Sequence, residues 1–151
     1  MSGGLPVIVI SDNQEGLKLF LEQKLKIKFW PPYFALGFAT NEKKPICVVL
    51  FNEYNGANIE LTIYADRGMV TRTVIRYLAE YVFNQLKCRR LTVRTKKRNK
   101  SVLKLAPRLG FKYENVVSRY FPDDDAVVFR MLREDCKWIR QDANLDTARA
   151  A

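Results

Sequence analysis

The sequence predicts an α+β fold, in which helices cover both faces of one mixed β-sheet. Two observations carry this prediction. Apolar runs typical of strands and amphipathic runs typical of helices follow the order β, α, three strands, α, β, α, β, β. The central helical run also connects two strand-like runs, residues 58–64 and 89–95, which a right-handed crossover makes parallel. The three strands before that helix are joined by short turns, so we expect them to be antiparallel.

The first half of the chain contains one predicted helix and four predicted strands. Residues 12–26 place leucine and phenylalanine at helical spacing, and Asp12 or Asn13 is available as the N-cap. The sequence "FWPPY" ends this helix, because proline cannot continue it. Asn55–Gly56 is a strong hairpin signal. The four strands are expected at residues 5–11, 33–40, 45–51 and 58–64.

The second half contains the strongest helix signal in the chain, residues 70–87. An unbroken apolar stripe at i, i+3 and i+4 runs from Val74 to Leu86. A shorter helix is expected to end at Gly110, and Pro107 is expected to shorten its last turn. The remaining predicted elements are strands at 89–95, 112–121 and 125–132, the short helix at 99–111, and a tail that begins helical and frays at about 140–151.

The composition is typical of one ordinary domain, residues 1–151, with 48% hydrophobic residues. No apolar run approaches the ~20 residues of a membrane span and no basic leader is present, so we expect a cytoplasmic protein without membrane contact. The three cysteines are far apart, which favours reduced thiols over a disulfide or a zinc site. The absence of histidine excludes Ser-His-Asp and Cys-His catalysis, so a general base must be a carboxylate, a lysine, a tyrosine or water.

The net charge of +10 is concentrated in residues 87–104, which contain nine lysines and arginines and no acid. Outside this basic segment, 17 basic residues stand against 16 acidic residues. Such a segment attracts phosphate groups, whether they belong to a nucleotide cofactor or to nucleic acid. The alternative is a solvated face that keeps the protein soluble.

The order of elements and several motifs resemble the GNAT superfamily of N-acetyltransferases. The resemblance runs from about Leu17 to Trp138 and is most specific over residues 98–132, where the chain follows the family's asparagine, short helix, "LGF" and two closing strands. The positions in register are Asn99, Leu105, Leu109, Gly110 and Phe111. The stretch "MLREDCKWI" is similar to a divergent group of acetyltransferase-like proteins that phages encode, which would place this protein in a host cytoplasm.

In that family, a turn with the pattern Gln/Arg-x-x-Gly-x-Gly/Ala binds the pyrophosphate of acetyl-CoA at a helix N-terminus. Arg67 fills the first position and Gly68 is a common second, whereas Val70 and Arg72 replace the two glycines. Because Val70 resists a positive φ, the loop is expected to take another path, on which the side chains of Arg67, Thr71 and Arg72 replace some backbone contacts. The alternative is an ordinary turn before a helix.

The resemblance also implies how acetyl-CoA is held and that no metal takes part. A strand N–H from the range Ile63–Ala65 would polarise the thioester carbonyl. The residues that the resemblance assigns to acetyl-CoA are Ile63, Tyr64, Ala65, Arg67, Gly68, Met69, Val70, Thr71, Arg72 and Asn99.

Glu60 is the first candidate for the general base, because many relatives carry a carboxylate on the equivalent strand. Strand alternation puts Glu60 and Tyr64 on the face opposite to the apolar residues between them, where they would border a substrate groove. The alternative is a solvated strand carboxylate. Glu53 and Asp66 are weaker candidates, since both lie at turns.

The general acid that protonates the leaving thiolate is harder to assign. The family's tyrosine, seven positions after the asparagine, corresponds to Ala106, and the serine that some relatives use corresponds to Val102. Ser101 lies one residue away, about 100° around the helix, and would serve only if the helix start shifts. Otherwise solvent or another residue protonates the thiolate, or the enzyme is weak or inactive.

Two functions from different classes follow. The first is an acetyl-CoA-dependent N-acetyltransferase, a monomer or homodimer, that acetylates an amine of a protein or small molecule by direct attack. The second is a catalytically silent protein that uses residues 87–104 to bind nucleic acid or an acidic protein. In this family the acceptor pocket lies around "FWPPY" and "FPDDD", where Asp123–Asp125 would suit a cationic acceptor or serve only as a turn. A sequence-specific DNA reader is not indicated, because no helix-turn-helix or RRM signature is present.

Overall fold

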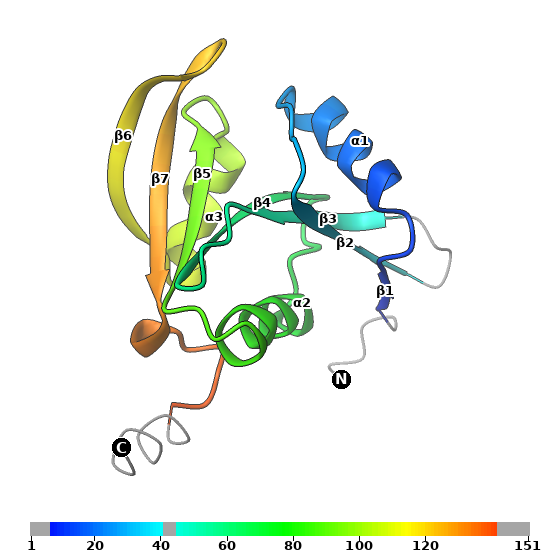
Figure 1. Cartoon of the computed structure of the whole chain (residues 1–151), viewed down its shortest axis with the longest axis vertical. Helices are drawn as coiled ribbons and strands as arrows, with labels where there is room; N and C mark the ends of the chain where they lie inside the picture. Colours follow the sequence, from blue (N-terminus) through cyan, green and yellow to red (C-terminus); the bar gives the residue numbers. More distant parts are fainter. Residues whose placement is uncertain (1–6, 41–44, 142–151) are drawn as a thin grey trace.

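The computed structural model describes residues 7–40 and 45–141, and its core is one seven-stranded mixed sheet in the order β1-β2-β3-β4-β5-β7-β6 (Figure 1). Every neighbouring pair is antiparallel except β4 and β5, which are parallel. The predicted α+β fold is confirmed. The strands are β1 (Ile8–Ile10), β2 (Tyr33–Ala39), β3 (Pro45–Asn52), β4 (Asn58–Ala65), β5 (Arg90–Lys96), β6 (Lys112–Phe121) and β7 (Asp124–Leu132). The helices are α1 (Gln14–Leu25), α2 (Arg72–Ala79) and α3 (Lys100–Leu109), with a π-helix η1 (Glu80–Gln85) and a 3₁₀ turn η2 (Arg133–Asp135).

Helix α1 covers one face of the sheet, over β2, β3 and β4. Asn13 is its N-cap, because the side chain accepts the N–H of Gly16 at 3.0 Å. Leu17 and Leu21 pack against a small cluster of buried residues on β2 and β3. Among the described residues, no helix lies on the other half of this face, over β5, β6 and β7 (Figure 1).

Helices α2 and α3 pack on the opposite face, where the larger core lies. The apolar stripe predicted for residues 70–87 is buried from Val74 to Phe83, as its spacing requires. The helix itself departs from the prediction: after Ala79 it widens into the π-helix η1, which ends with the Leu86 N–H donating to the Tyr81 carbonyl at 2.8 Å. The wider turns place the Tyr81 ring against Phe34 and Phe51.

The parallel strands β4 and β5 are paired only along their first halves. Their register partners run from Asn58–Arg90 to Leu61–Val93, although the strands continue to Ala65 and Lys96. Beyond that point β4 stays paired with β3, and β5 stays paired with β7. The sheet therefore opens into a wedge between β4 and β5. In Figure 1, β5, β6 and β7 stand upright at one side while β2, β3 and β4 turn away from them.

The end of the described chain packs against α3. The tail that was predicted to start helical makes only the 3₁₀ turn η2, after which Trp138 lies over the last turn of α3 and donates Nε1–H to the Leu109 carbonyl at 2.8 Å. Most of the predicted frayed tail lies outside the described residues. Within residues 7–40 and 45–141, no helix has the length and hydropathy needed to cross a membrane.

Candidate active site

The turn between β4 and α2 lies at the open end of the wedge. The Met69 N–H donates to the Asp66 carbonyl at 2.9 Å, which closes a tight turn around Arg67 and Gly68. Gly68 has a φ of +77°, and a Cβ built there would meet no atom within 4 Å. Open backbone at a glycine before a helix N-terminus is the setting in which proteins hold phosphate groups.

The side chains predicted to assist this turn are partly committed elsewhere. Val70 does not adopt a positive φ. Thr71 is the N-cap of α2, and its Oγ1 accepts the Val74 N–H at 3.3 Å. Arg67 and Arg72 are exposed, and no carboxylate in the described part of the chain pairs with either. The two arginines are therefore the side chains of this turn that remain available to an anion.

The start of α3 lies at the same end of the wedge, but its predicted site residues have other surroundings. Asn99 is the N-cap: its Oδ1 accepts the Val102 N–H at 3.4 Å and its Nδ2 donates to Thr95 Oγ1 at 3.2 Å. Helix α3 begins at Lys100, which turns the Val102 side chain into the core and leaves the Ser101 side chain exposed. The helix start has not shifted, which was the condition for Ser101 to act as the acid, so Ser101 is not directed into the buried face.

Glu60 projects from β4 onto the face that α1 half covers, as the alternation predicts, and belongs to a cluster of three side chains. Its Oε2 lies 2.5 Å from Nη1 of Arg94 on β5. The Arg94 guanidinium stacks on the Tyr120 ring at 4.6 Å, and its Nη1 donates to the Tyr120 hydroxyl at 3.3 Å. The carboxylate and guanidinium side chains are 16% and 23% exposed. The cluster lies where β4 and β5 begin to separate, because Leu61–Val93 is their last register pair.

Burial raises the pKa of Glu60 above its ordinary value, and the neighbouring Arg94 guanidinium opposes this effect. A carboxylate with a raised pKa holds a proton more firmly, which improves it as a base for an ammonium group. The ion pair keeps the carboxylate oriented, and the net direction of the pKa favours proton transfer. This combination of burial and a charged partner is typical of functional sites.

The remaining predicted residues of β4 and its turns have distinct positions. The side chain of Tyr64 packs in the α1 interface, with its ring 5.7 Å from the Phe20 ring and 5.4 Å from Lys24 Nζ. Asp66 is exposed in the turn before α2. Glu53 lies in the β3–β4 turn, at the other end of β4, and borders the cleft described below. These positions leave Glu60 as the half-buried carboxylate closest in sequence to the point of separation.

Four of the nine cations in the basic segment are neutralised within the protein. Arg90 pairs with Glu114 of β6, and Arg94 pairs with Glu60. The other two lie at the β6–β7 hairpin: Lys96 Nζ is 3.0 Å from an Asp123 carboxylate oxygen, and Arg98 Nε is 3.2 Å from an Asp124 carboxylate oxygen.

Asp123 and Asp124 of the acidic turn "FPDDD" are thus paired with the protein's own cations, which favours the interpretation of this stretch as a turn alone. Asp125 is also engaged, because it accepts the Arg119 N–H at 2.8 Å. Lys96 is itself buried and donates to the Lys26 carbonyl at the end of α1, at 3.0 Å. These contacts connect the end of β5 to the β6–β7 turn and to the end of α1.

A cleft of about 610 Å³ opens at the end of the sheet where β4 begins, opposite to the Gly68 turn. Eight of its fifteen lining residues are aromatic, so we name it the aromatic cleft. It is built from the segment after α1, the end of β3, the π-helix η1 and the tip of β6. The predicted acceptor region at "FWPPY" forms one wall, and Tyr120 of the Glu60 cluster forms part of another.

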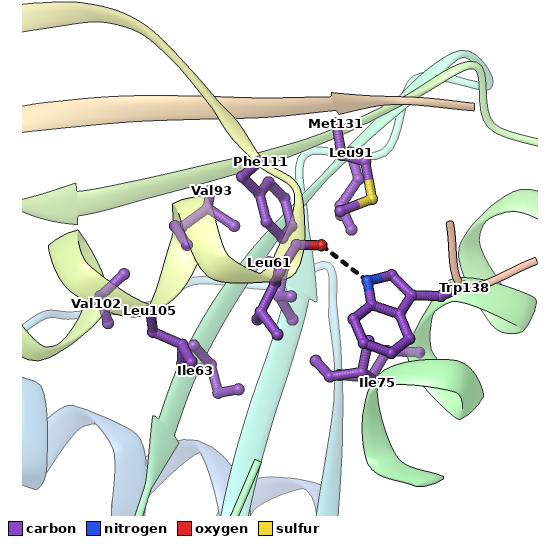
Figure 2. Close-up of a pocket in the computed structure, with 14 residues that line it drawn as sticks. Leu61, Ile63, Ile75, Leu91, Val93, Val102, Leu105, Phe111, Met131 and Trp138 are labelled. Atoms are coloured by element: carbon purple, nitrogen blue, oxygen red, sulfur yellow. Dashed lines mark hydrogen bonds between the residues drawn. The ribbon is translucent and has the colours of Figure 1, made fainter. Parts of the chain in front are cut away.

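A small apolar cavity of about 40 Å³ lies between α2, α3 and the separating strands (Figure 2). Figure 2 shows Leu61 and Ile63 of β4 and Val102 and Leu105 of α3 pointing into it, with Trp138 closing one end. Its volume suits little more than one water-sized group, so it is a gap in the packing and not a site for a cofactor.

Among the described residues, no group of three or more Cys, Asp or Glu side chains is close enough together to hold a metal ion. Cys47, Cys88 and Cys136 are buried free thiols, as predicted. Burial raises the pKa of the Cys47 thiol to about 12. Such thiols are poor nucleophiles.

Solved structures of similar shape include spermidine N-acetyltransferases. A dodecameric spermidine N-acetyltransferase from Vibrio cholerae has a TM-score of 0.69 and 16% identity, over 85% of this chain and 94% of that chain. A chimera of Vibrio cholerae SpeG and hSSAT has a TM-score of 0.71 and 15% identity, over 89% of this chain and 99% of that chain. SpeG from Vibrio cholerae in complex with manganese ions has a TM-score of 0.68 and 15% identity, over 92% and 96%. No protein-family model and no curated protein sequence matches the chain.

The chain has the GNAT fold. The parallel pair that separates halfway, the glycine turn at its open end and the likeness to three N-acetyltransferase structures agree on this point. The resemblance to phage-encoded proteins finds no support in these comparisons. At this level of identity the likeness shows the GNAT fold alone, so the chemistry depends on the residues that this chain places in it.

Proposed function

We propose that this protein is an acetyl-CoA-dependent N-acetyltransferase that acetylates a primary amine by direct attack. The observation that carries the proposal is the wedge between β4 and β5, with two helix N-termini at its open end and Glu60 at its closed end. The GNAT fold of the spermidine N-acetyltransferases supports the same class of reaction.

The residues at the open end fit the phosphate groups of acetyl-CoA. The first N–H groups of α2 and α3 have no partner within their helices, and both helix dipoles point their positive ends toward this edge. Arg67 and Arg72 flank the first helix start, and the exposed Lys97 and Lys100 flank the second. Gly68 supplies backbone that an anion can approach closely. We assign the pyrophosphate to this turn and the acyl chain to the wedge.

Main-chain groups of β4 would serve the carbonyl of the thioester. Within the described part of the chain, β4 has no strand partner on the side of β5 beyond Leu61, so an N–H from the range Ile63–Ala65 on that side would be available to donate. Acetyl-CoA supplies the activated acetyl group when it is bound. A fixed donor at the carbonyl oxygen stabilises the negative charge that develops there.

Glu60 would accept the proton from the attacking amine. The amine nitrogen forms a bond to the acetyl carbon, the carbon–sulfur bond breaks, and its electron pair leaves with sulfur as a thiolate. Arg94 holds the Glu60 carboxylate in place and Tyr120 holds Arg94. No acid of the family type occupies the Val102 or Ala106 position, and Ser101 is exposed, so we assign the last proton to solvent.

The alternative function, a silent protein that binds nucleic acid or an acidic partner, has a smaller free basic surface than the sequence suggested. Its binding surface was the nine cations in residues 87–104, and four of them pair with carboxylates inside the protein. The replaced glycines and the missing tyrosine, which also favoured it, bear on the rate of catalysis and on how the cofactor is held. The exposed cations at the open end of the wedge are accounted for by one cofactor.

Acetyl-CoA binding and turnover test the proposal. A ligand at about 100 times its Kd adds about 2.7 kcal/mol of stability, which raises the Tm of a domain of this size by about 5–10 °C. We expect this shift in a thermal unfolding titration, together with amine-dependent release of free CoA thiol. No shift at millimolar acetyl-CoA would contradict the proposal.

A further inference from the structure

We infer that the acceptor is a small primary amine with an aromatic body, bound in the aromatic cleft with its nitrogen toward Glu60. This inference rests on the acetyltransferase function proposed above and names its substrate class. It differs from what the likeness to spermidine N-acetyltransferases suggests, since spermidine is a flexible aliphatic polyamine. The argument has three steps, which concern the size of the cleft, its charge and its position.

The size and lining of the cleft suit one compact aromatic molecule. Its volume of about 610 Å³ lies within the range of roughly 300–1,000 Å³ that is usual for small-molecule sites. Trp30, Tyr54 and Tyr120 are 73%, 53% and 48% exposed, although side chains of this kind are usually more covered. Aromatic faces exposed around a concave site favour a ligand that stacks on them.

The charge of the cleft argues against a polyamine. Among its lining residues, all of which belong to the described chain, the charged side chains are Lys28 and Glu53, so the two charges cancel. A polyamine carries several ammonium groups and needs a carboxylate or carbonyl for each one that it buries. Glu60 already forms an ion pair with Arg94, and the acids of the β6–β7 turn form ion pairs with Lys96 and Arg98. The cleft supplies one carboxylate of its own, Glu53, and this favours an acceptor with a single ammonium group.

The position of the cleft places such an amine beside the proposed base. Asn52, which lines the cleft, is the register partner of Glu60 and lies on the same face of the sheet. Tyr120 belongs to both the cleft and the Glu60 cluster. A molecule stacked between Trp30 and Tyr120 can therefore direct a short aminoalkyl chain toward the closed end of the wedge, where the acetyl group would lie.

Steady-state kinetics with phenethylamine and spermidine, both at saturating acetyl-CoA, test the inference. We expect kcat/KM for phenethylamine to exceed that for spermidine by at least about tenfold. Equal or better turnover of spermidine would overturn the inference and leave the acetyltransferase function intact. Failure of acetyl-CoA to bind would instead overturn the proposed function, and thermal unfolding detects that outcome separately.

Binding without turnover gives a second readout. Trp30 and Trp138 are the tryptophans of the chain, and Trp30 lies in the cleft, so phenethylamine is expected to change the intrinsic fluorescence. Trp30→Ala should remove that change and raise KM for phenethylamine about tenfold, the loss expected for one stacked aromatic ring. Trp30→Phe should restore most of KM. Tyr113→Ala, an exposed tyrosine of β6 outside the cleft, is the matched control. An unchanged KM in Trp30→Ala would remove the cleft as the acceptor site.

Discussion

Replacing Glu60 by glutamine is the sharpest perturbation of the proposed chemistry. The substitution keeps the shape of the side chain and an oxygen that can accept from Arg94 Nη1, which lies 2.5 Å from Glu60 Oε2. It removes the negative charge and the ability to take a proton. Loss of a general base usually lowers turnover by about 10²–10⁴-fold, which corresponds to about 2.7–5.4 kcal/mol of activation free energy. We expect kcat to fall by this factor.

The cost of the same substitution to folding is expected to be much smaller. A hydrogen bond between charged groups contributes about 1.5–3 kcal/mol, and glutamine preserves part of it. The guanidinium of Arg94 also keeps its stack on Tyr120 at 4.6 Å. We therefore expect a loss of about 1–2 kcal/mol, which lowers Tm by about 2–8 °C and leaves the protein folded at 25 °C. Thermal unfolding of both proteins separates this loss from the catalytic effect.

The pH dependence of kcat/KM adds a second test of Glu60. As a base it acts in the ionised form, and its pKa is raised by burial, so wild-type activity should fall as pH drops through that raised pKa. The Glu60→Gln variant should lack this acid limb. Glu134→Gln changes an exposed carboxylate of the turn η2 that belongs neither to the cleft nor to the Glu60 cluster, and serves as the control. Turnover within threefold of wild type in Glu60→Gln would refute the assignment of Glu60 as the base.

Three further perturbations test the cofactor turn, the acceptor loop and the core. Arg67→Ala should weaken acetyl-CoA binding about fivefold, read by calorimetry, whereas Arg89→Ala, an exposed arginine at the opposite end of β5, should leave the Kd unchanged. Glu22→Gln should lower the free energy of unfolding by about 1–2 kcal/mol at pH 7, because the Glu22 carboxylate accepts the buried N–H of Phe29 and this bond lowers the pKa of Glu22. In urea unfolding, the difference in stability between wild type and variant should shrink as pH falls below 4.5, where the carboxylate becomes protonated. A difference that stays constant with pH would contradict this linkage. Trp138→Ala should cost about 2–4 kcal/mol, since the ring closes the apolar cavity, whereas Trp30→Ala should change stability by less than about 0.5 kcal/mol. Equal losses in the two tryptophan variants would contradict the packing described for them.

Much of the fold could be predicted from the sequence because local signals and the global fold agree. The stripe from Val74 to Phe83, the Asn55–Gly56 turn and the Gly110 end of α3 each have one dominant local cause. The π-helix η1 could not be predicted, because the same apolar spacing fits an α-helix equally well.

The candidate site was predicted less completely, since ion pairs between distant segments leave little local signal. Arg94 is two residues beyond Thr92, the register partner of Glu60, so the diagonal pair on one face follows once the parallel register is known. The stacking of Arg94 on Tyr120 and the ion pair between Lys96 and Asp123 could be predicted only once the β6–β7 hairpin was placed in space. Ser101 is exposed for a local reason, because the Asn99 cap fixes the helix start.

Calorimetric titration with acetyl-CoA and with 3′-phospho-ADP tests the central claim most directly. The nucleotide 3′-phospho-ADP carries the pyrophosphate and the ribose phosphate of acetyl-CoA but lacks the pantetheine and acyl chain, so a basic turn alone would bind the two ligands alike. If the wedge between β4 and β5 seats the chain and the thioester, acetyl-CoA should bind one to one and at least about tenfold more tightly than 3′-phospho-ADP, the equivalent of about 1.4 kcal/mol. Equal affinities, or no binding of acetyl-CoA at millimolar concentration, would contradict the account.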